Sequence, residues 1–377
     1  METSVQKKIW LSSPHMGGTE RSYVEEAFNT NWIAPLGPNV SGFESDLEAY
    51  VGNDVHVACL SSGTGAIHLA LELLGVGQGD DVLCQSFTFA ASANPIIYLG
   101  AKPVFIDSEA DTWNISPELL EKAILDGIQQ GKKPKAIIAV HLYGMPYKVD
   151  EITAISKKYD IPVIEDSAEA LGSSYKGFMC GSFGDMAILS FNGNKIITTS
   201  GGGALVSKDR NMKEKAVFLS TQARDNAPHY QHSHIGYNYR MSNVLAGIGR
   251  GQMEVLSDRV GARRNNFLKY KEHLAGITDI SFLDEPAGSH SNRWLTCVLF
   301  PSFEMRETIR IALGHENIES RPLWKPMHLQ PVFEDAVSYA NGISEDLFNR
   351  GLCLPSGSNL NHEDLERICT LIKNELR

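Results

Sequence analysis

The chain has 377 residues, enough for a large buried core and a second, smaller domain. Apolar residues make up 42% and charged residues 21%, with 15 Phe, 12 Tyr and 5 Trp, which excludes a disordered or low-complexity chain. The formal net charge of −11 argues against broad electrostatic binding to nucleic acid or to an anionic membrane, but leaves room for a local basic pocket that holds one phosphorylated ligand.

Short β-branched runs alternate with helical patterns through the first part of the chain. The patterns predict strands at 55–60, 82–84, 103–107, 135–141, 161–166, 187–191 and 204–207, and helices at 66–74, 90–99 and 149–159. Segment 135–141 is apolar nearly throughout, as expected of a strand covered on both faces. Because such alternation is typical of parallel sheets with right-handed crossovers, we expect an α/β fold with a mostly parallel, mixed sheet covered by helices.

The pattern changes after residue 242. Residues 246–274 are typical of one or two long helices, 294–300 of a strand, and 304–313 and 363–376 of helices. We therefore expect residues 1–245 to form a large domain and residues 246–377 a smaller α+β domain.

A turn of small residues, 61–65, follows the first predicted strand and precedes a helix. Small residues let backbone amides approach an anion, and the positive end of the helix dipole favours a phosphate there. An ordinary N-cap by Ser or Thr explains the same residues equally well. The chain has neither a GxxxxGK[ST] nor a GxGxxG loop to decide between them.

Asp166 stands at the carboxyl end of the predicted strand 161–166, where open parallel sheets bind their ligands. A carboxylate at this place suits the stabilisation of a protonated ring nitrogen. The alternative is a helix N-cap, because the residues that follow Asp166 also fit that role.

Lys195 lies between the predicted strand 187–191 and the glycines at 201–203. A lysine held there in a partly desolvated pocket becomes reactive, and the glycines allow tight turns and close backbone approach. Most lysines are solvated surface groups, so the interpretation of Lys195 as a reactive lysine depends on the neighbouring motifs. In the later segment 236–241, Asn238 and Arg240 either reach an anionic ligand or pin the loop.

Together these segments resemble the fold-type I, pyridoxal-phosphate-dependent aminotransferases of the DegT-like family, which act on nucleotide-linked keto sugars. The resemblance covers nearly the whole chain and rests on APLGP (34–38), SGTGA (62–66), SFTF (86–89), IED (164–166), SFNGNK (190–195), TSGGG (199–203) and YNYRM (237–241), in this order. PHMGG (14–18), NWIA (31–34), STQAR (220–224) and RPLWK (321–325) are most similar to the bacillosamine-pathway branch. That branch aminates carbon 4 of a UDP-linked 2-acetamido-2,6-dideoxy-4-keto-hexose.

The resemblance implies how the ring of pyridoxal 5'-phosphate is held. Lys195 would carry the cofactor as a Schiff base, Asp166 would pair with the pyridine nitrogen, and Phe89 would lie against the ring. Glu169 occupies a position that is often Gln or His in the family, where it touches the ring hydroxyl. A carboxylate there must be protonated or act differently, so the role of Glu169 stays open.

The resemblance also implies how the phosphate is held. The amides of Gly63 and Thr64, with the Ser190 hydroxyl, would bind it. Asn238 would reach the phosphate in the neighbouring subunit, so that activity requires a homodimer.

L-glutamate is the expected amino donor, and a UDP-linked 4-keto sugar the expected acceptor, in two half-reactions with ping-pong kinetics. Arg321 and Lys325, on either side of Trp324, could supply charge and a stacking surface near the nucleotide. The expected substrate-binding residues are Asn31, Trp32, Ile33, Ala34, Arg321, Pro322, Leu323, Trp324, Lys325 and His328. The alternatives are a structural loop at 321–325, and a core position for Trp32 and Ile33.

Three other functions compete with this one. A GDP-linked 4-keto-6-deoxy sugar, as in perosamine-type enzymes, is the alternative substrate. Dehydratases of the same fold replace the Schiff-base lysine with histidine, whereas this chain has Lys195. The third alternative is not an enzyme but a regulator that binds the cofactor without turnover. The intact Lys195 and Asp166 argue against it.

No metal site is expected. His229, His232 and His234 have no carboxylate or cysteine partner at supporting spacing, which favours a polar loop. The six cysteines form no CxxC pair and are expected to be buried thiols in a reducing cytoplasm. Residues 1–10 show no export signal, so we expect a cytoplasmic protein.

Overall fold

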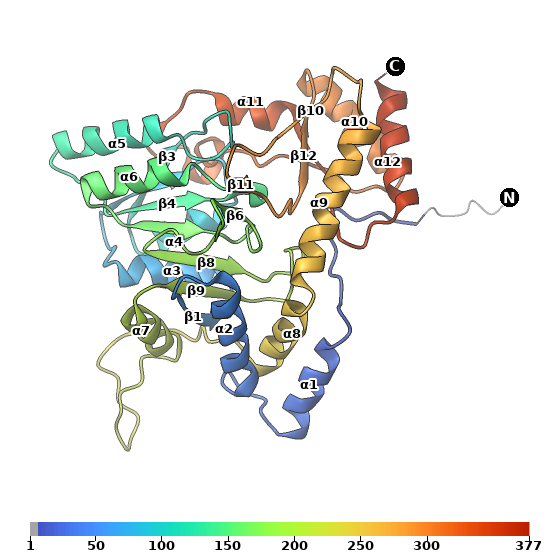
Figure 1. The fold of residues 1–377 in the computed structure, drawn as a ribbon. Helices are drawn as coiled ribbons and strands as arrows, with labels where there is room; N and C mark the ends of the chain where they lie inside the picture. The colour runs from blue at the N-terminus through green and yellow to red at the C-terminus, as the bar shows by residue number, and fades with distance from the viewer. Residues whose placement is uncertain (1–6, 377) are drawn as a thin grey trace.

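The computed structural model describes residues 7–376, which are built around an eight-stranded sheet (Figure 1). The strand order is β1-β9-β8-β5-β4-β2-β3-β14. Strand β9 is antiparallel to both β1 and β8, and the pairs from β8 to β14 are parallel. The strands are β1 (His56–Leu60), β2 (Asp81–Gln85), β3 (Lys102–Ile106), β4 (Ala136–Val140), β5 (Val163–Asp166), β8 (Met186–Ser190), β9 (Gly203–Ser207) and β14 (Ser338–Tyr339). The expected mostly parallel, mixed sheet is confirmed.

Helices cover both faces of this sheet. Strand β4 shows why, because Ile138 packs with the apolar side chains of α3, α4 and α7, whereas its neighbours Ile137 and Ala139 pack with those of α5 and α6. A strand buried on both faces needs apolar residues at every position, as segment 135–141 has. The covering helices are α2 (Pro38–Val51), α3 (Gly63–Leu73), α4 (Asn94–Tyr98), α5 (Pro117–Gln129), α6 (Val149–Tyr159) and α7 (Arg210–Ser220), whereas α1 (Glu20–Asn29) packs against α8 (Asn243–Met253).

Two consecutive helices, α8 (Asn243–Met253) and α9 (Leu256–His273), lead from the large sheet to a second, antiparallel sheet of order β10-β12-β15-β13 (Figure 1). Apolar residues of α9, α10 and α12 pack with this sheet. The elements are β10 (Ser281–Phe282), β12 (Thr296–Leu299), β13 (Arg321–Pro322), β15 (Gly351–Leu354), α10 (Phe303–His315), α11 (Ile343–Arg350) and α12 (His362–Glu375). Strand β14 comes from this later part of the chain and pairs with β3 of the large sheet.

Short elements complete the fold. A three-stranded sheet joins β11 (Ser289–His290), β6 (Ser174–Tyr175) and β7 (Phe178–Met179), and four single turns of 3-10 helix lie at η1 (Ala90–Ser92), η2 (Leu142–Gly144), η3 (Met327–Leu329) and η4 (Pro331–Phe333). The predicted helix 90–99 is wrong as one element, because η1 precedes a separate α4. Pro95 has no amide hydrogen to continue helical bonding across the junction.

No helix within residues 7–376 combines the length and the apolar character that a membrane crossing requires. The expected lack of an export signal falls partly on residues 1–6, which lie outside the described residues.

Candidate active site

A cavity of about 320 Å³ opens at the carboxyl ends of β5 and β8, beside the N-terminus of α3. This is the edge at which parallel sheets bind ligands, because helix N-termini and loops converge there. Trp294 and Trp324, from the C-terminal part of the chain, close another side. Of the predicted cofactor residues, the cavity brings together Gly63, Thr64, Phe89, Asp166, Glu169, Ser190 and Lys195.

Asp166 is the last residue of β5, and both of its carboxylate oxygens are held. The Ser92 hydroxyl donates to Oδ2 over 2.7 Å, and the Ala168 amide donates to Oδ1 over 3.1 Å. Ser92 Oγ also lies 2.8 Å from Thr88 Oγ1. Since the single hydroxyl hydrogen of Ser92 goes to Asp166, Thr88 is the donor in this second bond. The helix N-cap alternative is wrong, because turns and no helix follow Asp166.

Lys195 points its amine into the same cavity. Its Nζ lies 3.4 Å from Glu169 Oε1 and 4.2 Å from the centre of the Trp294 ring, and the side chain is 13% exposed. Trp294 is fixed in turn, because its Nε1 donates to the Asn194 carbonyl over 2.7 Å. The lysine is thus largely removed from water while its amine stays accessible from the cavity.

Glu169 is buried beside Lys195. The Tyr143 amide donates to Glu169 Oε2 over 2.7 Å, and the Asn292 side chain donates to the Glu169 carbonyl over 2.9 Å. Burial raises the pKa of Glu169, and the nearby Asp166 raises it further, against the opposing effects of Lys195 and of the Tyr143 amide. Glu169 therefore takes up a proton more readily than an exposed glutamate.

The N-terminus of α3 forms an anion cradle. Ser62 caps the helix by accepting the Gly65 amide over 3.0 Å, so the N-cap interpretation of this turn is correct. The amides of Gly63 and Thr64 nevertheless have no hydrogen-bond partner within residues 7–376. Gly203 keeps the backbone close to them, because a Cβ there would lie 2.3 Å from the Gly63 nitrogen. Free amides at a helix N-terminus suit a phosphate, as the alternative interpretation holds.

These groups fit pyridoxal phosphate. The Gly63 and Thr64 amides offer unpaired donors for a phosphate, and Lys195 offers an amine for an aldehyde. Asp166 offers a fixed carboxylate for a protonated ring nitrogen. Phe89 and Trp324, whose rings contact each other with centres 5.4 Å apart, line the same cavity.

Asn238 does not line the cavity of its own chain. It is exposed, and its Oδ1 accepts the Gln222 side-chain amide over 3.0 Å. Its expected reach into a neighbouring subunit stays a prediction. Arg240 pins the loop, because its guanidinium pairs with Glu44 and donates to the Cys59 carbonyl over 2.9 Å.

The structure divides segment 321–325 between two places. Trp324 lines the cofactor cavity, and Leu323 is buried in the core. Arg321 and Pro322 line a different cavity, where Arg321 pairs with Glu319 over 3.0 Å. They lie outside the cofactor cavity, and their expected contact with the substrate stays a prediction. Lys325 and His328 are likewise absent from the described lining of the cofactor cavity; His328 Nδ1 lies 2.6 Å from Ser86 Oγ.

Segment 31–34 lies between α1 and α2 and does not line the cavity of its own chain. The Asn243 side chain and amide anchor it by donating to the carbonyls of Trp32 over 3.1 Å and Ala34 over 2.9 Å. The core alternative is wrong, because Trp32 is 41% and Ile33 48% exposed, and Asn31 is exposed as well.

The middle of the loop between α7 and α8 projects from the body of the molecule (Figure 1), whereas Ala223 and Met241 near its ends are buried. It carries the exposed His229, His232 and His234, and His232 Nδ1 lies 2.9 Å from the Gln222 carbonyl. Tyr230 and Ile235 on the same loop are also strongly exposed.

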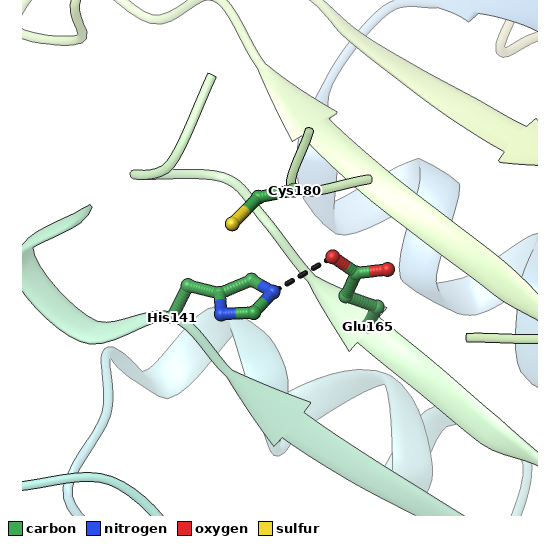
Figure 2. A group of neighbouring side chains, drawn as sticks. All are labelled: His141, Glu165 and Cys180. Atoms are coloured by element: carbon green, nitrogen blue, oxygen red, sulfur yellow. Dashed lines mark hydrogen bonds and ion pairs between the residues drawn. The ribbon is translucent and has the colours of Figure 1, made fainter. Parts of the chain in front are cut away.

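Three potential metal ligands, His141, Glu165 and Cys180, meet under the carboxyl end of β5, with ligand atoms within 4.8 Å of one another (Figure 2). Hydrogen bonds already use both ring nitrogens: Nε2 faces Glu165 Oε1 at 2.7 Å, and Nδ1 accepts the Tyr147 amide over 3.1 Å. His141 therefore donates to Glu165. The cluster thus ties neighbouring strands together directly beside Asp166.

Glu165 is fully buried and accepts further hydrogen bonds from the amides of Gly181, Phe183 and Gly184. Burial raises its pKa, but the hydrogen bond from His141 and these amides outweigh burial and leave the pKa of Glu165 lowered. The Glu165 carboxylate thus connects His141, at the end of β4, with the segment 181–184 by hydrogen bonds.

Sequence reasoning missed Ser92, Thr88 and Trp294. Ser92 is separated from Asp166 by 74 positions and Trp294 from Asn194 by 100, so no local pattern links them. Thr88 is part of the SFTF motif, but the motif does not indicate that the Thr88 hydroxyl bonds to another residue of the site.

Comparison with known proteins agrees with this geometry. The family model of the DegT/DnrJ/EryC1/StrS aminotransferase family matches residues 14–373. EpsN of Bacillus subtilis (strain 168), named as a pyridoxal phosphate-dependent aminotransferase, is 54% identical over 98% of this chain and 96% of its own. GDP-perosamine synthase of Escherichia coli O157:H7 is 36% identical over 97% of this chain and 98% of its own.

A solved structure shares the fold. It is that of a DegT DnrJ EryC1 StrS aminotransferase from Brucella abortus, with a TM-score of 0.88 and 30% identity over 94% of this chain and 95% of its own. The chain therefore belongs to the DegT/DnrJ/EryC1/StrS family of sugar aminotransferases, has their fold-type I architecture and uses pyridoxal phosphate.

Proposed function

We propose that the protein transfers the amino group of L-glutamate to carbon 4 of a UDP-linked 2-acetamido-2,6-dideoxy-4-keto-hexose. The observation that carries the reaction type is the Lys195 amine and the doubly held Asp166 carboxylate in one cavity, beside two unpaired helix amides. The similarity of segments 14–18, 31–34, 220–224 and 321–325 to the bacillosamine-pathway branch supports this sugar.

Each residue of the cofactor cavity has a separate role in the proposed reaction. The Gly63 and Thr64 amides, with the Ser190 hydroxyl, bind the cofactor phosphate, and Asp166 keeps a negative charge opposite the ring nitrogen, favouring its protonated form. When bound, pyridoxal phosphate supplies an electron sink for the electrons released as a C–H bond breaks. Lys195 moves the proton, because its amine lies inside the cavity and out of bulk water.

Glu169 and the aromatic rings complete the proposed site. Glu169 lies 3.4 Å from the Lys195 amine and orients it by hydrogen bonding. Phe89 and Trp324 cover the ring and limit the access of water.

The active form is proposed to be a homodimer in which Asn238 reaches the cofactor phosphate of the neighbouring subunit. Asn238 is exposed and lies outside its own cavity, which leaves its side chain available to a second copy. The exposed Trp32, Ile33, Tyr230 and Ile235 support a surface that a second copy covers.

A GDP-linked 4-keto-6-deoxy sugar is the second candidate substrate. The 36% identity to a GDP-perosamine synthase over nearly the whole chain favours it. One assay separates the two: the holoenzyme is incubated with L-glutamate and either the UDP-linked or the GDP-linked keto sugar, and the amino sugar is measured by mass spectrometry. Conversion of the GDP sugar alone contradicts the proposed substrate.

Lys195→Ala should abolish product formation, because no other lysine among residues 7–376 lines the cofactor cavity to hold the cofactor and move the proton. Lys122→Ala is the control, since Lys122 is 60% exposed and pairs with Asp126 on the outer helix α5. The holoenzyme should also be yellow, with a band near ~420 nm that L-glutamate bleaches. A band that persists under glutamate would instead favour a regulator without turnover or another amino donor.

A further inference from the structure

A second cavity, of about 720 Å³, lies in the C-terminal part of the chain. Helix α10, the segment 317–322 and residues Lys8 and Trp10 bound it. Within the part of the chain that the structure describes, no residue lines both this cavity and the cofactor cavity, and the proposed reaction makes no use of it. Its volume lies in the range of small-molecule sites, roughly 300–1,000 Å³.

Positive charge dominates this second cavity. Its lining contains the four cations Lys8, Arg306, Arg310 and Arg321 and the two carboxylates Glu307 and Glu319. Each carboxylate already holds one arginine, Glu307 with Arg310 over 2.8 Å and Glu319 with Arg321 over 3.0 Å. An excess of positive charge thus remains at one place in a chain of net charge −11, which suits an anionic ligand.

Arg306 is the most buried of these cations. Its side chain is 2% exposed, and Nε and Nη1 have no hydrogen-bond partner among the described residues, although Nη1 lies 3.4 Å from Glu307 Oε1. The Ser320 hydroxyl, in the same lining, is buried without a partner too. Buried donors without acceptors cost free energy, and phosphate oxygens are the acceptors that arginine binds best.

Aromatic rings stand next to these cations. Trp10 is 54% and Phe303 48% exposed, and both line the cavity. The Lys8 amine lies 4.2 Å from the Trp10 ring centre, and the Arg306 guanidinium lies 4.8 Å from that of Phe303. Exposed rings beside cations provide a stacking surface for a planar base next to a site for phosphate.

We propose that this second cavity binds a nucleoside diphosphate, with its phosphates at Arg306, Arg310 and Arg321 and its base against Trp10 and Phe303. This site does not overlap the cofactor cavity, because the described linings of the two cavities share no residue.

Equilibrium dialysis of the holoenzyme tests the proposal, with UDP, GDP, uridine and inorganic diphosphate as probes. The double variant Lys8→Gln/Arg310→Gln removes the exposed Lys8 and the partly exposed Arg310 from the cavity, and Lys122→Gln/Lys158→Gln removes two exposed cations elsewhere. The first variant should lose one bound nucleoside diphosphate per chain or bind it about tenfold more weakly, whereas the second should match the wild type. Glu307→Gln, which frees Arg310, should tighten binding about two- to fivefold.

Three results would overturn the proposal. The wild type binds no UDP or GDP; or Lys8→Gln/Arg310→Gln binds them with wild-type stoichiometry and affinity; or inorganic diphosphate binds as tightly as UDP and GDP, which leaves the base without a role. Unchanged transamination by Lys8→Gln/Arg310→Gln, measured in parallel, shows that the catalytic cavity is intact.

Discussion

Ser92→Ala should impair the active site although Ser92 lies behind the carboxylate of Asp166. The variant removes the 2.7 Å hydrogen bond to Asp166 Oδ2 and leaves the Thr88 hydroxyl without its acceptor. Ser92, Thr88 and Asp166 are all buried, so the variant weakens the hold on a carboxylate that is shielded from bulk water. A hydrogen bond to a charged group contributes about 1.5–3 kcal/mol, which corresponds to about a ten- to hundredfold loss if the bond is fully used in the reaction.

Thr88→Val is the matched comparison. It removes only the neutral bond to Ser92, worth about 0.5–1.5 kcal/mol, and leaves Ser92 bonded to Asp166, so the loss should be about two- to tenfold. Because Thr88 acts on Asp166 only through Ser92, the double variant should resemble Ser92→Ala rather than show the sum of both losses.

Stopped-flow measurement of the L-glutamate half-reaction, followed at the cofactor band near ~420 nm, gives these rates, and urea unfolding checks that each variant is folded. A wild-type rate for Ser92→Ala, or fully additive losses in the double variant, would refute the relay from Thr88 through Ser92 to Asp166.

Three further predictions follow from other parts of the site. The folded-state pKa of Glu169 is raised above its usual 4.5, so the folded protein binds a proton that the unfolded chain releases. The stability of the cofactor-free wild type relative to Glu169→Gln should therefore fall as pH rises from 4.5 through the raised pKa, and urea unfolding that gives a pH-independent difference contradicts this. Glu165→Ala leaves the His141 ring N–H and several buried amides without an acceptor, at about 1–3 kcal/mol for each unsatisfied donor, and should lower the unfolding free energy by at least about 3 kcal/mol. A urea-measured loss under about 1 kcal/mol would exclude this structural role. Gly203→Ala places a Cβ 2.3 Å from the Gly63 nitrogen and should weaken cofactor binding at least about tenfold in fluorescence titration, whereas Gly261→Ala, with open space around its Cβ, should bind as the wild type does.

Local patterns in the chain were sufficient to predict seven of the eight strands of the large sheet, all but β14, and the centre of the site. The alternation of apolar segments and helical spacing predicted the strands β1, β2, β3, β4, β5, β8 and β9, because burial on both faces requires apolar residues at successive positions. Lys195 and Asp166 follow strands in that pattern, and parallel strands end at one edge, so their meeting in one cavity was predictable.

Tertiary structure alone decided what surrounds that centre. Ser92 reaches Asp166 only because the segment after β2 passes over the carboxyl end of β5, and Trp294 reaches Lys195 only because the C-terminal part packs against the large sheet. Arg321 and Trp324 are three positions apart yet line different cavities. A sequence specifies which residues have a given periodicity, but contacts across many positions depend on strand order and packing, which no local window contains.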